Sequence, residues 1–136
     1  MIASDMVTWI ATLLSLTPAT SIFLNSRPNG KEAPNVVSVW DCPTYDNVNG
    51  SGLAMDNWGV QIEFRNKAAA NAKSQAMIVH KAIMGFSGQL HISSPVVDVV
   101  TCDQVPYALG QDEDMLHTVM SKYRLTVEST GDAIRI

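Results

Sequence analysis

The chain has 136 residues, of which 46% are hydrophobic and 16% charged, which is enough to bury the core of one ordinary domain. The formal net charge of −4 argues against a protein that binds nucleic-acid phosphates, because such proteins carry a basic surplus. The sequence has neither an apolar stretch of membrane-spanning length nor an internal repeat. We therefore expect one soluble, mildly acidic domain over residues 1–136.

The first periodic pattern predicts an amphipathic helix over Asp5–Leu16. Its large apolar side chains fall on one half of a helical wheel, and its Ser and Thr side chains fall on the other half. A secretory signal is disfavoured because no Lys or Arg precedes the apolar run and an acidic residue stands in that place. Ser4 is expected to cap the helix and Pro18 to end it.

Strand patterns follow the first helix. Two β-branched and aromatic runs predict strands at Thr20–Ser26 and Asn35–Asp41. Pro43–Asn57 is rich in Gly, Asn and Asp and is predicted to form a long surface loop. Trp58–Asn66 alternates apolar and polar residues strictly, which predicts a strand with one buried face and one solvated face.

A second amphipathic helix is predicted at Lys67–Met84 and is expected to end at Gly85. The side chains expected to face the core are small, which favours close packing on a sheet: Ala68, Ala72, Ala76, Val79 and Ile83. A second apolar stripe, Ala70, Met77 and Met84, recurs every seven residues away from that face. This stripe is a candidate subunit interface. The alternative is that the helix is buried from two sides within its own subunit.

The last third of the chain returns to strand patterns. Strands are predicted at Gln89–Ser93, Val96–Val105 and His117–Ser129, and Pro106–Met115 is predicted to be a loop. The order of elements indicates an α+β fold, with an antiparallel or mixed β-sheet and two α-helices packed on one face.

The sequence contains no recognisable constellation of catalytic, cofactor-binding or metal-binding residues. Two cysteines far apart, Cys42 and Cys102, are expected to be free, partly buried thiols. Metal-ligand spacing is absent around the three histidines, His80, His91 and His117. Signatures of nucleophilic enzymes, zinc hydrolases and phosphate-binding loops are also absent. We therefore expect a protein that is not an enzyme.

Charge is distributed unevenly along the chain. Gly59–His91 carries four cations and one anion, whereas Ile92–Leu116 carries five anions and no cation. A subunit with one basic and one acidic region can associate head-to-tail, and such contacts close into a ring where the rotation permits. Scattered, solvated charge is the alternative interpretation.

Two segments carry a resemblance to a known family. The strand Trp58–Arg65 leads directly into the small-residue helix Ala68–Met84, and the segment Pro106–Glu113 (PYALGQDE) precedes the strand around Tyr123–Val127. This succession resembles the small tail-completion proteins of tailed bacteriophages, the tail terminators, which are also labelled minor capsid proteins. The length of the chain and its first helix also agree with that family.

The resemblance implies a structural protein of the virion. Tail terminators form a ring, commonly a hexamer, that caps the finished tail tube at its head-proximal end and offers the surface to which the filled head docks. The implied partners are other copies of the chain, the major tail tube protein and a head–tail connector protein. DNA would pass through the ring without specific binding, no membrane would be involved, and assembly would take place in the host cytoplasm.

Within this resemblance, Asp112, Glu113 and Asp114 are candidates for a channel or docking loop, because negative charge would keep passing DNA from adhering. The loop Pro43–Asn57 is expected to become ordered on docking. Two alternatives stay open. One is a head-side connector, such as a head-closure or adaptor protein, and the other is a small enzyme or ligand-binding α+β domain, which requires a pocket with convergent polar groups.

Overall fold

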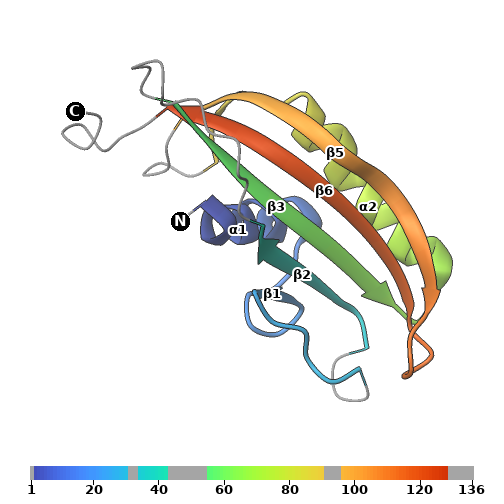
Figure 1. Ribbon diagram of the computed structural model, residues 1–136. Helices are drawn as coiled ribbons and strands as arrows, with labels where there is room; N and C mark the ends of the chain where they lie inside the picture. Colours follow the sequence, from blue (N-terminus) through green and yellow to red (C-terminus); the bar gives the residue numbers. More distant parts are fainter. Residues whose placement is uncertain (1, 31–33, 43–54, 91–95, 129–136) are drawn as a thin grey trace.

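The computed structural model describes residues 2–30, 34–42, 55–90 and 96–128 (Figure 1). The elements in chain order are α1 (Ile2–Leu14), β1 (Ile22–Leu24), β2 (Val36–Asp41), β3 (Met55–Asn66), α2 (Ala69–Met84), β4 (Gly88–Gln89), β5 (Val96–Gln111) and β6 (His117–Glu128). The described strands form one sheet in the order β1-β2-β3-β6-β5-β4. Strands β1 and β2 are parallel, and every other neighbouring pair is antiparallel. The α+β class with a mixed sheet is as predicted.

Both helices pack on one face of the sheet, which we call the helix face; the opposite face is the open face. Alternate residues of β3, Val60, Ile62 and Phe64, are fully buried on the helix face. Helix α1 lies against β1 and β2, and α2 lies against β3, β5 and β6. The two helices meet where Trp9 and Phe86 make an edge-on ring contact with centroids 5.5 Å apart. The described elements therefore share one core.

Helix α1 differs from the prediction at both ends. It begins at Ile2, so Ser4 lies inside the first turn and is not the N-cap. It ends at Leu14, before Pro18, because Ser15 adopts a left-handed backbone conformation with φ of 57°. The N–H of Leu16 then donates to the C=O of Ala11 at 2.8 Å, a bond typical of a left-handed helix end.

Helix α2 agrees closely with the prediction. It begins after Ala68, whose backbone is extended, and it ends at Gly85 as expected. Four of the five predicted core residues are buried, namely Ala72, Ala76, Val79 and Ile83. Ala68 is exposed because it precedes the first helical turn. The small side chains let the helix axis approach the sheet closely.

The predicted solvated face of β3 is wrong at the end of the strand that precedes α2. Arg65 is only 2% exposed and Glu63 only 7%, whereas the apolar Trp58 is 39% exposed. The chain before β2 folds over the open face, where Pro28 accepts a hydrogen bond from Arg65 Nη1 at 2.9 Å. Strand β3 also begins at Met55, so Met55–Asn57 is not part of a loop; residues 43–54 of that predicted loop lie outside the described residues.

The predicted loop at Pro106–Met115 is also largely wrong. Strand β5 continues through Pro106 to Gln111, and only the following residues form a turn. Beyond Val97, β5 has no described strand on its outer side, and an edge strand tolerates a proline without loss of an interior ladder bond. A shift of register against β6 between Gln104 and Tyr107, which spans this proline, accommodates the irregular backbone.

Strand β4 begins one residue earlier than predicted. It covers Gly88–Gln89 and pairs with Val96–Val97 of β5, whereas residues 91–95 lie outside the described residues. Strand β6 agrees with its prediction as far as Glu128, and its apolar residues Val119, Tyr123 and Leu125 are buried as expected. The predicted tail at 131–136 lies outside the described residues.

The close approach of α2 to the sheet makes a testable prediction. Replacing the fully buried Ala76 by Leu adds three carbons where the helix meets the strands, so Ala76→Leu should lower the free energy of unfolding by about 2 kcal/mol. Urea denaturation followed by circular dichroism measures this change. Ala70→Leu, which makes the same change at an exposed position of the same helix, is the control and should alter stability by less than about 0.5 kcal/mol. Equal stability of the two variants would contradict the packing described here.

Candidate functional site

The predicted interface stripe on α2 does not form one continuous surface. Ala70 is exposed and Met84 is 41% exposed, whereas Met77 is half-buried and faces β5. The alternative, that the stripe is covered within its own subunit, therefore applies in part to Met77. It does not apply to Ala70 or Met84, which are exposed. A contact with another subunit remains a prediction for all three residues, Ala70, Met77 and Met84.

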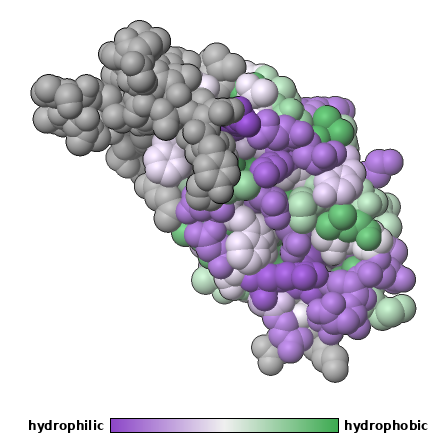
Figure 2. Space-filling model, in the orientation of Figure 1, coloured by the Kyte–Doolittle hydropathy of each residue, from purple (hydrophilic) through white to green (hydrophobic). Residues whose placement is uncertain are grey.

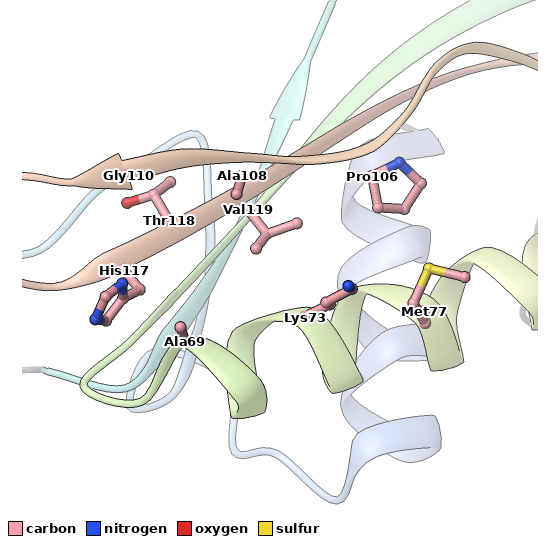
Figure 3. A pocket seen from close by; sticks show the side chains of 9 residues that line it. All are labelled: Ala69, Lys73, Met77, Pro106, Ala108, Gly110, His117, Thr118 and Val119. Atoms are coloured by element: carbon pink, nitrogen blue, oxygen red, sulfur yellow. The ribbon is translucent and has the colours of Figure 1, made fainter.

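A pocket of about 280 Å³ lies between α2 and the strands β5 and β6 (Figure 3). Figure 3 shows Met77 extending from α2 toward Pro106 of β5, and β6 contributes His117, Thr118 and Val119 to the lining. The lining residues are Ala69, Lys73, Met77, Pro106, Ala108, Gly110, His117, Thr118 and Val119. Small residues at three of these positions, Ala69, Ala108 and Gly110, leave the space open, and Lys73 places a positive charge at its edge.

The surface around this pocket has a positive potential. Helix α2 contains no Asp or Glu, and its region carries three exposed lysines, Lys67, Lys73 and Lys81. The first turn of the helix has no side-chain cap, so its N–H groups add a positive partial charge near Ala69. The pocket is therefore suited to an apolar group that carries a negative charge beside it.

The acidic turn between β5 and β6 lies beside the open face and is held there by two arginines. Asp112 Oδ2 accepts hydrogen bonds from Arg65 Nη2 at 2.7 Å and from Arg65 Nε at 3.1 Å. Arg27 Nη2 donates to the same oxygen at 3.1 Å, and Arg27 Nε is 3.2 Å from Glu63 Oε1. Because Arg65 and Asp112 are almost completely buried, each charge depends on the other for stabilisation.

The same carboxylate also shapes the turn. Asp112 Oδ1 accepts hydrogen bonds from the backbone N–H groups of Asp114 at 2.9 Å and Leu116 at 3.0 Å. Asp114 Oδ2 in turn accepts the N–H of Gly30 at 3.2 Å. A Cβ atom on Gly30 would lie 2.7 Å from Asp114 and from Leu116, so this close contact requires glycine.

These contacts determine the protonation of Asp112. Its burial acts to raise the pKa, but hydrogen bonds from Leu116, Arg65 and Asp114 and the charge of Arg65 outweigh this effect and lower the pKa to about 2. Asp112 is therefore ionised throughout the physiological range.

The three predicted acidic residues consequently differ in environment. Asp112 and Asp114 are turned toward Arg65 and the chain around Gly30, whereas Glu113 is exposed and makes no ion pair with any described residue. Beside it, Met115 is 65% exposed and has a left-handed backbone with φ of 64°. A role of this turn in a channel or in docking remains a prediction. The chemistry that the turn presents to solvent is one carboxylate beside one methionine.

The open face is otherwise mainly hydrophilic (Figure 2). Exposed apolar side chains interrupt it along β5, namely Val105, Tyr107 and Leu109. Their exposed fractions range from 39% to 56%, and they belong to a strand whose outer edge has no described partner beyond Val97. An exposed strand edge of this kind is suited to contact with another protein.

The histidines, the cysteines and Tyr123 show no arrangement typical of a catalytic site among the described residues. His80 Nδ1 lies 2.8 Å from the hydroxyl oxygen of Tyr123, so His80 is a satisfied histidine as expected. Burial raises the pKa of Tyr123 to about 12. Cys42 and Cys102 are free, half-buried thiols, also as expected. His91 lies outside the described residues, and His117 lines the pocket.

Within the described ranges, no cluster of His, Cys, Asp or Glu has the geometry to hold a metal ion. None of the helices described here is long and apolar enough to cross a membrane.

Sequence reasoning missed the buried arginine and the pocket. The one local signal for Arg65 was a cation at the end of a strictly alternating strand, and that pattern by itself favours a solvated side chain. The pocket is formed by residues from α2, β5 and β6, which are distant in the sequence. The one feature of the sequence that pointed to it was the second apolar stripe of α2, because Met77 of that stripe lines the pocket.

The fold is similar to that of known structures, although the sequence is not. No protein-family model matches the chain. No curated protein matches it either. A solved structure described as the virion of a native gene transfer agent (GTA) particle contains a chain with the same fold, at a TM-score of 0.54 and 20% identity. The likeness covers 88% of this chain and 84% of that chain. A second solved structure has a TM-score of 0.49 and 14% identity, over 93% of this chain and 90% of that chain.

The buried ion pair predicts a specific loss of stability. Asp112→Asn leaves the Arg65 guanidinium buried without its main partner, so it should lower the free energy of unfolding at pH 7 by about 3 kcal/mol. Because the pKa of Asp112 falls from 3.8 to about 2 on folding, its stabilisation is complete above pH 5. It is lost progressively as the pH falls from about 4 through about 2. Urea denaturation at a series of pH values measures both effects.

Glu113→Gln is the matched control, since it makes the same chemical change at the exposed neighbour and should alter stability by less than about 0.5 kcal/mol. Below pH 4 the wild-type protein should lose stability more steeply than Asp112→Asn. Parallel pH profiles of the two proteins would show that Asp112 does not carry this stabilisation.

Proposed function

We propose that the protein is a structural component of a phage-like virion that caps the completed tail tube as a ring and provides the surface for head–tail joining. The observation that carries the proposal is the fold that this chain shares with a chain of the gene transfer agent virion. The likeness extends over nearly the whole of both chains, so it concerns the complete described fold rather than a shared motif. A role without enzymatic activity is part of the proposal.

The sequence resemblance to tail terminators supports the choice of position within the virion. The residues that carry it form β3 and α2 and the end of β5 with its acidic turn, which lie next to one another in the fold. The proposed partners are further copies of the chain, most simply in a hexamer, together with the major tail tube protein and a head–tail connector protein. DNA would pass through the ring without specific binding.

The acidic turn supports a docking role better than a role in lining a channel. Of its three carboxylates, Asp112 and Asp114 are paired with Arg65, and Glu113 alone presents a solvated charge. A repulsive channel lining needs unneutralised charge, whereas specific docking needs a rigid shape with a few defined groups. We therefore assign the turn to contacts between proteins.

Deletion of the gene tests the proposed function. We expect lysates of the deletion strain to contain filled heads and separate tails, with tubes that are overlong or lack a cap, because nothing terminates tube growth. Electron microscopy of negatively stained lysates measures tail length, and immunogold labelling of the complemented strain should locate the protein at the head-proximal tip of the tails. A strain complemented with the wild-type gene is the control for tail length.

Other outcomes would change the assignment. Tails of normal length beside unjoined heads, with the label on heads, would indicate a head-side connector instead of a terminator. Normal particles in the deletion strain, with no label on any particle, would contradict a role in the virion altogether.

A further inference from the structure

We infer that the pocket between α2, β5 and β6 receives the β5–β6 turn of a second copy of the chain. In this contact the Met115 side chain enters the apolar pocket, and Glu113 pairs with Lys73 at its edge. The inference rests on the proposed function, since it describes how neighbouring subunits of the ring would recognise each other. The pocket of one copy would thus bind the turn of the next copy.

The pocket has the dimensions and character of a site for a side chain. At about 280 Å³ it lies at the lower limit of the roughly 300–1,000 Å³ that is usual for sites of small-molecule ligands. Its walls are formed mainly by aliphatic groups, among them Met77, Pro106 and Val119. A methionine is well suited to such a site, because its unbranched side chain adapts to irregular apolar surfaces.

The turn presents its apolar group at low entropic cost. Met115 is 65% exposed, the largest exposed fraction among the exposed large apolar side chains of the described chain. The backbone on both sides of it is fixed, since Asp112 Oδ1 accepts the N–H groups of Asp114 and Leu116 and Arg65 holds the same carboxylate. A contact made by a rigid turn loses little conformational entropy on binding.

Charge complementarity selects the occupant. Lys73 lines the pocket and makes no ion pair with any described residue, and the uncapped first turn of α2 adds positive potential beside it. Glu113 is the exposed acid of the turn and stands two residues before Met115. The turn of a second copy therefore supplies in one short segment the two groups that the pocket requires.

The turn and the pocket lie on opposite faces of the sheet, which favours a head-to-tail contact between copies. The turn is bound to the open face through Arg65 and Gly30, whereas the pocket lies on the helix face under Ala108 and Val119. Each copy thus has a donor surface and an acceptor surface on opposite faces of the same end of the sheet. Repetition of one such heterologous contact generates a ring when the rotation closes.

Disulfide trapping in assembled particles tests the contact. In Met115→Cys/Ala69→Cys, one new thiol lies on the turn and the other lies at the pocket, and only a disulfide between copies gives a cross-linked species of higher mass. We expect oxidised particles carrying this variant to give a ladder of cross-linked species on non-reducing gels, at least about fivefold more intense than in either single variant. The single variants are matched controls because they retain the same native thiols, Cys42 and Cys102.

Charge reversal tests the ion pair separately. Glu113→Lys and Lys73→Glu each place like charges together, so each should reduce incorporation of the protein into particles by about tenfold, and the double variant should restore it. Lys81→Glu makes the same change on the same helix about two turns beyond Lys73, at a residue that does not line the pocket, and should have no effect. Quantitative immunoblotting of purified particles measures incorporation, and unfolding midpoints of the purified variants verify that they are folded.

The results distinguish the contact from the proposed function. If the variant is present on tail tips but gives no more cross-linking than the single variants, the contact is wrong and the role in the virion stands. The contact is also wrong if Met115→Cys becomes linked to a different virion protein or if the double charge reversal restores nothing. Absence of the wild-type protein from particles would overturn both the proposed function and the contact.

Discussion

The buried ion pair between Arg65 and Asp112 is the interaction on which the functional surfaces of the structure depend. A guanidinium with 2% exposure has to be matched by an anion and by further hydrogen-bond acceptors, and Asp112 and the C=O of Pro28 provide them. This requirement joins three segments that are distant in the sequence: the end of β3, the chain before β2 and the turn between β5 and β6. It also explains why Gly30 allows no side chain, because the turn must approach the backbone closely enough for Asp114 to accept its N–H.

The position of this turn determines which groups the molecule can offer to a partner. Two of its carboxylates are committed to internal contacts, so its chemistry toward solvent reduces to Glu113 and Met115. On the other face of the sheet, small residues of α2 and β5 leave an apolar pocket with a basic edge. One end of the sheet therefore carries two unlike surfaces, and the proposed contact between copies would join them head-to-tail.

Much of the fold could be predicted from the sequence because it depends on periodicity. The alternation Val60-Ile62-Phe64 and the small-residue stripe of α2 each reflect one element with one buried side, and both predictions are confirmed. Predictions that relied on single residues were weaker. Ser4 was expected to be a helix cap and Pro106 to begin a loop, but the helix begins two residues before Ser4 and an edge strand passes through Pro106. A cap or a breaker acts only through the backbone around it, and the tertiary packing of that backbone decides its conformation.

The sequence by itself determined the α+β class, the two amphipathic helices and the face of each central strand that enters the core. It also contained the acidic run at Asp112–Asp114 and the second apolar stripe on α2, but not their relation to the rest of the molecule. The tertiary structure alone decided that Arg65 is buried, that Asp112 is its partner 47 positions away, and that Met77 lines a pocket. The physical reason is that hydrophobic periodicity is a local property of one element, whereas the burial of a charge depends on which distant segments cover it.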